Sequence, residues 1–120
     1  MTADKVWIVD DDRSIRWVLE KALMQEGLEA TAFEDAQTLL NKLGKEKPHA
    51  IVTDIRMPGI DGLTLLAKIR LEHPDVPVIV MTAHSDLDSA VSSYQGGAFE
   101  YLPKPFDVDD AINLVKRAIA

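Results

Sequence analysis

The sequence predicts a doubly wound α/β fold, because buried-strand patterns alternate with amphipathic helix patterns along the whole chain. Short apolar runs at 6–9, 50–53 and 78–81 are bounded by polar or turn residues, which is typical of strands buried on both faces of a parallel sheet. Parallel neighbours need crossover connections, so helices are expected on both faces of the sheet. A length of 120 residues is that of one domain.

The first half of the chain is expected to hold three strands and two helices. The run at 6–9 precedes the clearest helix, which ends near Gly27 because glycine readily adopts the conformation that closes a helix. This helix is marked by apolar residues at helical spacing: Ile15, Val18, Leu19, Ala22 and Leu23. A weaker strand at 29–33 leads into a second helix that ends at Gly44, and the strand at 50–53 follows.

The second half continues the alternation. A third helix, marked by Leu63, Leu66 and Ile69, is closed by His73-Pro74 and followed by the strand at 78–81. A fifth strand is expected at about 98–102. A last helix is marked by Val108, Ala111, Ile112, Val115 and Ile119.

The segment from Ser85 to Gly97 is expected to form a weak fourth helix. Ser85 and Asp88 resemble a capping box at its start, but serine and glycine are poor helix formers and apolar anchors are few. A marginal helix beside a reactive site can be the bistable part of a switch, and an ordinary surface helix fits the pattern equally well.

Composition excludes several classes of function. The net charge is −7 and the thirteen basic residues are scattered, so we expect no direct contact of this domain with nucleic acid. No cysteine is present, which excludes disulfides, thiol nucleophiles and thiolate zinc sites. The apolar run near the N-terminus is too short for a signal peptide or a membrane span, so we expect a cytoplasmic domain without membrane contact.

Chemistry-bearing residues follow the expected strands. In open parallel sheets, ligands bind outside the carboxyl ends of the strands. The residues found there are Asp10, Asp11 and Asp12 after the first strand, Asp54 after the third, Thr82 and Ala83 after the fourth, and Pro103, Lys104 and Pro105 after the fifth. Acidic, hydroxyl and basic groups are therefore expected to meet at one edge of the sheet.

Such a cluster needs a cation. Two carboxylates about 4 Å apart repel by about 4 kcal/mol at an effective dielectric of about 20, and Mg²⁺ prefers hard oxygen ligands and often accompanies phosphate. An aspartate can accept a phosphoryl group as an acyl phosphate, and Asp54 is the best candidate because it ends a strand alone. Lys104 could pair with the transferred group, and the Thr82 hydroxyl could donate a hydrogen bond to it.

Each signal also has an ordinary structural interpretation. A run of three aspartates is more often a solvated turn or a helix cap, and Asp12 in particular fits the start of a helix. Asp54, Thr82 and Lys104 taken singly fit turn, structural or exposed positions. The shared placement at four strand ends favours the joint functional interpretation.

The chain resembles the receiver domains of bacterial two-component response regulators over essentially its whole length. Together the motifs are specific: Val9-Asp10-Asp11, Asp54 with Met57-Pro58-Gly59 and Asp61-Gly62, Thr82-Ala83, and Lys104-Pro105. Longer stretches, such as Ser14-Ile15-Arg16-Trp17-Val18-Leu19 and Gly97 to Asp107, are similar to the subgroup of nitrogen regulatory protein C.

The resemblance implies a flavodoxin-like fold of strand order 2-1-3-4-5 and phosphorylation of Asp54 by a sensor histidine kinase. It implies Mg²⁺ in the acidic pocket, with Asp10 and Asp11 as the usual pair, Asp12 as an additional carboxylate, and the Arg56 carbonyl as a ligand. It places Ala83 beside Thr82 and Lys104 around the phosphoryl group, and it implies a cis Lys104–Pro105 bond. The domain would be a phosphoacceptor that assists its own phosphorylation and dephosphorylation, not an enzyme.

The resemblance also implies a population shift on phosphorylation. The surface that changes would contain Thr82, His84, Ser85, Asp86, Asp88, Tyr94 and Tyr101. In the subgroup this surface controls a σ54-dependent ATPase that activates transcription, joined to a DNA-binding domain. We therefore expect a single receiver domain, 1–120, from a larger transcriptional regulator of nitrogen metabolism, and the resemblance leaves dimerisation on phosphorylation open.

Three alternatives compete with this interpretation. A haloacid-dehalogenase phosphatase also uses an aspartyl nucleophile, but it needs an aspartate two residues later, where this chain has Arg56. A flavin or nucleotide binder would need a glycine-rich phosphate loop, and none occurs. A receiver-like interaction module that never sees phosphate would not need the full set of Asp54, Thr82, Lys104 and acidic pocket.

Overall fold

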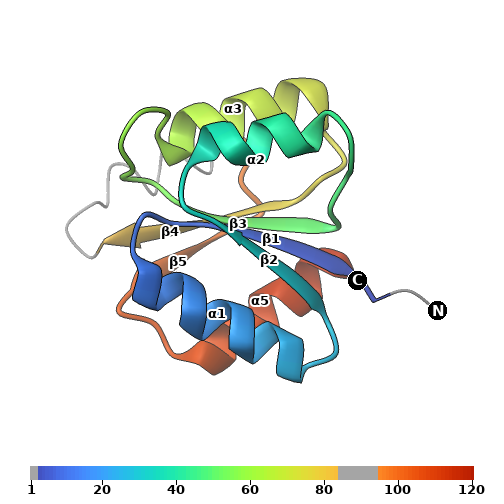
Figure 1. Cartoon of the computed structure of the whole chain (residues 1–120), viewed down its shortest axis with the longest axis vertical. Coiled ribbons are helices and arrows are strands. Elements are labelled where there is room, and N and C mark those ends of the chain that lie inside the picture. The colour runs from blue at the N-terminus through green and yellow to red at the C-terminus, as the bar shows by residue number, and fades with distance from the viewer. Residues whose placement is uncertain (1–2, 84–94) are drawn as a thin grey trace.

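The computed structural model describes residues 3–83 and 95–120. It contains one five-stranded parallel sheet of order β2-β1-β3-β4-β5, as the sequence and the resemblance predicted. Helices α1 and α5 cover one face of the sheet, and α2 and α3 cover the other (Figure 1). The elements are β1 (Lys5–Val9), α1 (Arg13–Gln25), β2 (Glu29–Phe33), α2 (Ala36–Leu43), β3 (Ala50–Asp54), α3 (Gly62–Glu72), β4 (Val78–Ala83), β5 (Glu100–Lys104) and α5 (Val108–Ile119).

Each of the four described helices begins after an aspartate. The side chain of this residue accepts a hydrogen bond from a backbone N–H of the first turn, which satisfies one of the donors left without a partner at a helix start. The four caps are Asp12, Asp35, Asp61 and Asp107. Part of the acidic composition therefore serves helix formation.

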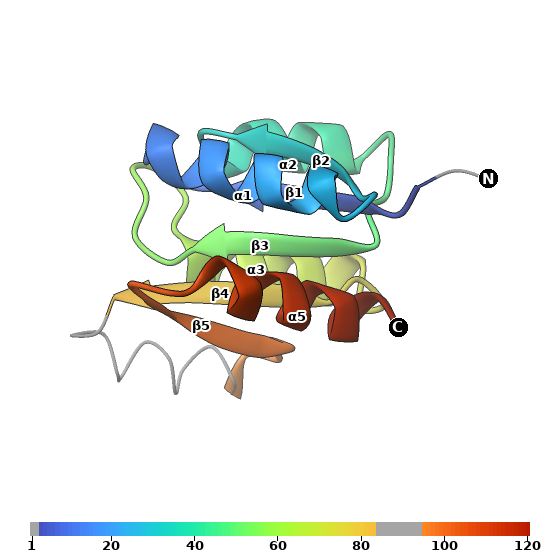
Figure 2. The ribbon, with the colours of Figure 1, turned by 90° about the horizontal axis from the view of Figure 1, so that it is seen from below.

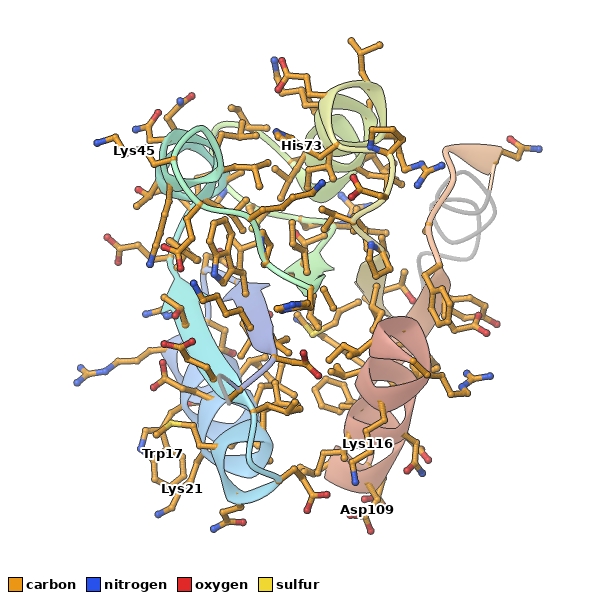
Figure 3. The ribbon with its side chains drawn as sticks, turned by 90° about the vertical axis from the view of Figure 1, so that its right-hand side faces the viewer. Trp17, Lys21, Lys45, His73, Asp109 and Lys116 are labelled. Carbon is orange, nitrogen blue, oxygen red and sulfur yellow. The ribbon has the colours of Figure 1, made fainter. Side chains whose placement is uncertain are left out.

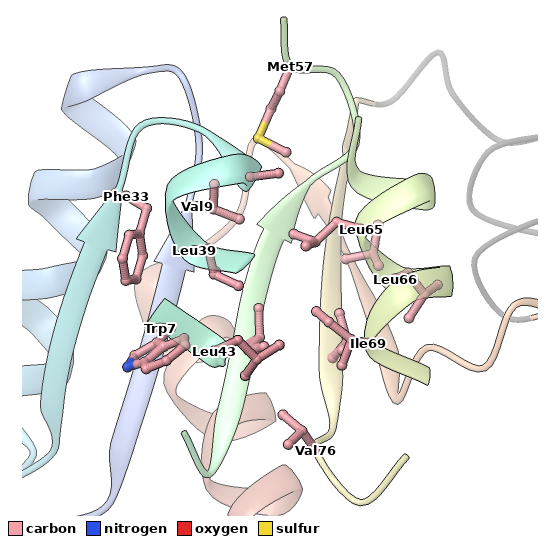
Figure 4. Close-up of a cluster of buried hydrophobic side chains, with 14 of the residues drawn as sticks. Trp7, Val9, Phe33, Leu39, Leu43, Met57, Leu65, Leu66, Ile69 and Val76 are labelled. Carbon is pink, nitrogen blue, oxygen red and sulfur yellow. The ribbon is translucent and has the colours of Figure 1, made fainter. Parts of the chain in front are cut away.

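Side chains alternate between two apolar cores along the central strands. Trp7 and Val9 of β1 pack in the core under α2 and α3, where the Trp7 and Phe33 rings meet edge to face at 5.5 Å (Figure 4). Val6 and Ile8 point to the opposite core under α1 and α5. This double burial explains why the strands appear in the sequence as continuous apolar runs.

A cation–aromatic pair and an ion pair lie at the surface of the layer formed by α1 and α5. Trp17 is 60% exposed, and the Lys21 ammonium lies 4.7 Å from the centre of its ring; both side chains point away from the sheet (Figure 3). Lys116 of α5 donates to Glu26 at the end of α1 at 2.5 Å.

None of the helices in the part of the chain that the structure describes has the length and apolar character needed to span a bilayer.

The fifth strand lies two residues later than the sequence indicated. Pairing with β4 aligns Ile79 with Glu100 and Ala83 with Lys104, so β5 includes Pro103 and ends at Lys104. The expected strand stopped before Pro103; proline lacks a backbone donor, but β5 is an edge strand, where that donor is dispensable. The helix expected from Ser85 to Gly97 falls mostly outside the described residues, as do the proposed switch residues His84, Ser85, Asp86, Asp88 and Tyr94.

Candidate functional site

The carboxyl ends of the strands carry the candidate site on one side of the sheet, at the left in Figure 2. Asp54 is the last residue of β3 and pairs with Met81 of β4, next to Thr82. Lys104 is the last residue of β5 and pairs with Ala83. Asp10 directly follows β1. The parallel order therefore brings together residues that lie far apart in the sequence.

Three carboxylates form the acidic group of the site. Asp10, Asp11 and Asp54 each offer one oxygen atom, and these atoms lie within 4.8 Å of one another. Asp10 is fully buried and Asp54 is 8% exposed, whereas Asp11 is exposed. Hard oxygen donors grouped around an open side are what Mg²⁺ requires, because this ion keeps several of its waters. The donor set thus fits the ion that the resemblance implies.

Lys104 supplies the positive charge inside this group. Its Nζ lies 3.0 Å from Asp10 Oδ2 and 3.2 Å from Asp54 Oδ2. Burial alone would lower the pKa of the Lys104 ammonium, but the hydrogen bond and charge of Asp10 and the charge of Asp54 raise it above its ordinary value. Lys104 is therefore held as a cation between the two buried carboxylates.

Burial raises the pKa of the Asp10 carboxyl, because the anion loses its hydration. Two contacts act in the opposite direction: Oδ1 accepts from the Asp12 backbone N–H at 2.8 Å, and Oδ2 accepts from Lys104. The nearby Asp54 charge adds to the rise. The free acidic pocket is consequently an unfavourable place for negative charge, and a bound cation would relieve it.

This electrostatic cost predicts the behaviour of Asp10→Asn without metal. In Mg²⁺-free buffer at about pH 7 the variant should be more stable than the wild type, because it buries a neutral amide while Lys104 keeps its pair with Asp54. The pKa of Asp10 in the folded protein lies above its ordinary value of 3.8, so ionisation of Asp10 destabilises the folded wild type at neutral pH. The wild type regains this stability as the pH falls through the folded pKa towards 3.8.

Urea unfolding of both proteins between about pH 7 and about pH 4 measures this difference. The gap in unfolding free energy between variant and wild type should shrink as the pH falls. A variant that is less stable at every pH would mean that the lost ion pair with Lys104 outweighs the cost of burial.

Asp12, expected as an additional metal carboxylate, lies outside the acidic group. It is the N-cap of α1, and its Oδ1 accepts from the Ser14 backbone N–H at 2.8 Å. The sequence run of three acids thus divides into a buried carboxylate, an exposed one and a helix cap. The helix-start interpretation of Asp12 fits this geometry, because a capping oxygen is already engaged.

A matched pair of variants tests this division. Asp11→Asn should weaken Mg²⁺ binding by at least about tenfold, because it removes a charged ligand. Asp12→Asn removes the same charge one residue later but keeps the cap, since asparagine caps helices as well as aspartate does. Its Mg²⁺ affinity should stay within about threefold of wild type, as measured by calorimetry; equal losses in both variants would count against the division.

The remaining predicted residues lie around the carboxyl ends of the strands, except Tyr101, which lies near the start of β5. Thr82 is buried and Ala83 is exposed at the end of β4, and Tyr101 is half-buried on β5. Arg56 is exposed and lines a cavity of about 500 Å³ with Asp11 and Asp61. The Lys104–Pro105 bond, expected to be cis from the resemblance, is cis.

Two residues near the site have roles that sequence reasoning missed. Gly62, the first residue of α3, donates to the Ile55 carbonyl at 2.7 Å, and a Cβ at this position would lie 2.1 Å from the Asp54 carbonyl oxygen. Arg16 donates from Nη1 to the Asp10 carbonyl at 2.7 Å. The sequence did carry one signal for Gly62: a glycine at the start of a helix, where the turn does not require one, can indicate that another backbone segment lies very close. No comparable feature of the sequence indicated the contact of Arg16 with Asp10.

Comparison with protein families places these features in context. The family described as "Response regulator receiver domain" matches residues 6–116. The chain is 61% identical over 115 residues to the DNA-binding transcriptional regulator NtrC of Escherichia coli, and 40% identical to the C4-dicarboxylate transport transcriptional regulatory protein DctD of Pseudomonas aeruginosa. These matches cover 96% of this chain but only 24% and 25% of the two regulators.

Comparison with solved structures also matches this chain to receiver domains. The apo receiver domain of nitrogen regulatory protein C is 60% identical and superposes with a TM-score of 0.89, covering 99% of this chain and 96% of that one. Its BeF3-activated form superposes with a TM-score of 0.84 over the same shares. NtrX from Brucella abortus is 34% identical with a TM-score of 0.92, and this chain covers 27% of it.

Proposed function

This chain belongs to the response regulator receiver domain family, and from that premise we propose that it is a signalling switch that accepts a phosphoryl group on Asp54. The observation that carries the proposal is the contact of one lysine with two buried carboxylates, Lys104 with Asp10 and Asp54, beside a third carboxylate on Asp11. A charged group placed this way suits a site that receives a dianionic phosphoryl group.

The proposed chemistry is phosphoryl transfer to a carboxylate. An oxygen of Asp54 forms a bond to phosphorus while the bond from phosphorus to the donor's leaving atom breaks, so the product is an acyl phosphate. Asp10, Asp11, Asp54 and the Arg56 carbonyl would hold Mg²⁺, which when bound neutralises charge on the carboxylates and on the phosphoryl oxygens.

The chain's own residues would orient and stabilise the product. The Lys104 ammonium, 3.2 Å from Asp54 Oδ2, can turn to a phosphoryl oxygen once that carboxylate is phosphorylated. The Thr82 hydroxyl lies on the neighbouring strand and can donate to another oxygen, as can the backbone N–H of Ala83. These contacts form only after transfer, so they favour the phosphorylated arrangement.

The proposed output is a shift of the surface that includes Thr82 near the end of β4 and Tyr101 near the start of β5. We propose a sensor histidine kinase as the phosphodonor and the cytoplasm as the place where this domain acts. Because the relatives that share 61% identity are DNA-binding transcriptional regulators about four times longer, we propose that this domain controls a σ54-dependent ATPase and a DNA-binding domain in nitrogen regulation. Dimerisation on phosphorylation would fit the same role.

The test is to mix the protein with Mg²⁺ and acetyl phosphate and to follow intact mass and amide NMR shifts. The expected result is a mass gain of one phosphoryl group, with shifts concentrated around Asp54, Thr82 and Tyr101. A Mg²⁺-dependent shift without mass gain would favour a phosphate-independent interaction module. Turnover of acetyl phosphate without any accumulated phosphoprotein would favour a phosphatase.

A further inference from the structure

Arg16 contacts the acidic turn from the side of α1. Its Nη1 donates to the backbone carbonyl of Asp10 at 2.7 Å, a contact between a helix side chain and the residue that directly follows the first strand. The side chain is half-buried. The chemistry proposed above uses Asp10 and Asp11 but gives Arg16 no part.

Arg16 completes the fixation of Asp10. The Asp10 backbone N–H donates to the Phe33 carbonyl at 3.2 Å, Oδ1 accepts from Asp12 N–H at 2.8 Å, and Oδ2 accepts from Lys104 at 3.0 Å. The carbonyl oxygen is the remaining polar atom of Asp10, and Arg16 binds it. A hydrogen bond from a charged donor is stronger than a neutral one, so this contact restrains the peptide plane between Asp10 and Asp11.

The orientation of that peptide matters most for Asp11. Within residues 3–83 and 95–120, the Asp11 carboxylate makes no hydrogen bond or ion pair, so side-chain contacts do not aim it at the pocket. Its position follows from the backbone on either side. Arg16 fixes the preceding carbonyl, and Asp12, as the cap of α1, fixes the following residue.

We propose that Arg16 is a positioning residue for the metal pocket, which by holding the Asp10 carbonyl aims the Asp11 carboxylate at the cation. The proposal rests on the proposed function, because it assigns Arg16 to the same Mg²⁺ site. It predicts that loss of Arg16 changes the orientation of the Asp11 carboxylate. A purely electrostatic role would instead change Mg²⁺ affinity in the same way as the loss of any nearby positive charge.

Arg13 provides the matched control. It is the first residue of α1, three positions before Arg16 and beside the same acidic turn, and among the described residues its side chain has no hydrogen bond or ion pair. Arg13→Gln and Arg16→Gln each remove one positive charge, and glutamine is a good helix former. Only the second removes a hydrogen bond to Asp10. Arg16→Lys keeps the charge and loses the planar donor group.

The experiment measures Mg²⁺ affinity by calorimetry, unfolding free energy in Mg²⁺-free buffer, and the Mg²⁺-free amide shifts of Asp11 and Asp12. Arg16→Gln should weaken Mg²⁺ binding about tenfold, with Arg16→Lys between it and wild type, because outer contacts of metal ligands have effects of this size. Arg13→Gln should change affinity by less than about twofold. The two amide signals should move in Arg16→Gln alone.

Equal changes in the Arg13 and Arg16 variants would overturn the proposal in favour of a pure charge effect. A loss of stability in Arg16→Gln with unchanged Mg²⁺ affinity and unchanged Asp11 amide would reduce Arg16 to a structural contact. Failure of the wild type itself to bind Mg²⁺ would overturn the proposed function. The metal-free amide shifts would then still decide whether Arg16 sets the backbone at Asp11.

Discussion

Asp54→Asn protein is expected to gain no phosphoryl mass when mixed with Mg²⁺ and acetyl phosphate, whereas the wild type gains one phosphoryl group. The carboxylate oxygen is the proposed nucleophile, and an amide oxygen is too weak a nucleophile to replace it. Asparagine has nearly the same shape, so Lys104 and the end of β3 should remain in place. The measurement is intact mass over a time course, and the phosphorylated form of Asp54→Asn should stay below the detection limit throughout.

Asp61→Asn is the matched control for this variant. Asp61 is another carboxylate on the same side of the sheet, but its Oδ1 accepts from the Thr64 backbone N–H at 2.8 Å as the cap of α3. Asparagine preserves that cap, so phosphorylation should be within about threefold of wild type. A phosphoryl gain that persists in Asp54→Asn would place the acceptor on another carboxylate of the group.

Gly62→Ala should destabilise the fold by about 3 kcal/mol or more, the upper range for forcing atoms into a packed site. The added Cβ would lie 2.1 Å from the Asp54 carbonyl oxygen and 2.7 Å from the Ile55 Cα, and both are backbone atoms that cannot rotate away. Either α3 or the end of β3 must move. The variant should therefore also lose phosphorylation under conditions where it remains folded.

Gly44→Ala is the control for a general glycine effect. Gly44 follows α2 as its C-cap with a φ of −68°, in the right-handed helical region. A Cβ there would meet its nearest neighbour, the Asn41 carbonyl, at 3.7 Å, an ordinary contact. This change should be neutral or stabilising by up to about 1 kcal/mol. Urea unfolding in Mg²⁺-free buffer compares the two variants, and similar small effects in both would contradict the close approach at Gly62.

The sequence predicted most of the fold because strands that are buried on both faces appear in it as continuous apolar runs. The runs at 6–9, 50–53 and 78–81 correspond to β1, β3 and β4, and the weaker strand at 29–33 matches β2. The prediction for β5 was displaced: the expected strand stopped before Pro103, whereas the edge position allows proline inside it. Local pattern does not reveal which strand lies at an edge.

The candidate site was predictable where residue type and strand end coincide, as at Asp54, Thr82 and Lys104. It was less so where several like residues adjoin: the sequence offered Asp12 both as a helix start and as an additional metal carboxylate, and only the folded structure, in which Asp12 caps α1 outside the group of Asp10 and Asp11, distinguishes the two. The roles of Gly62 and Arg16 depend on contacts with the backbone of other elements, at Asp54 and Asp10. Such contacts become visible only when the chain is folded.

The ion pair between Lys104 and Asp10 joins residues 94 positions apart. During synthesis the three carboxylates leave the ribosome long before their lysine, and every parallel pairing of the sheet must wait for a crossover to close. A chain that is unfinished, or cut before β5, therefore has the acids but lacks the cation that holds them. If Asp54 accepts the phosphoryl group as proposed, a chain that lacks β5 is expected not to be phosphorylated, because the site is complete only when the last strand has joined the sheet.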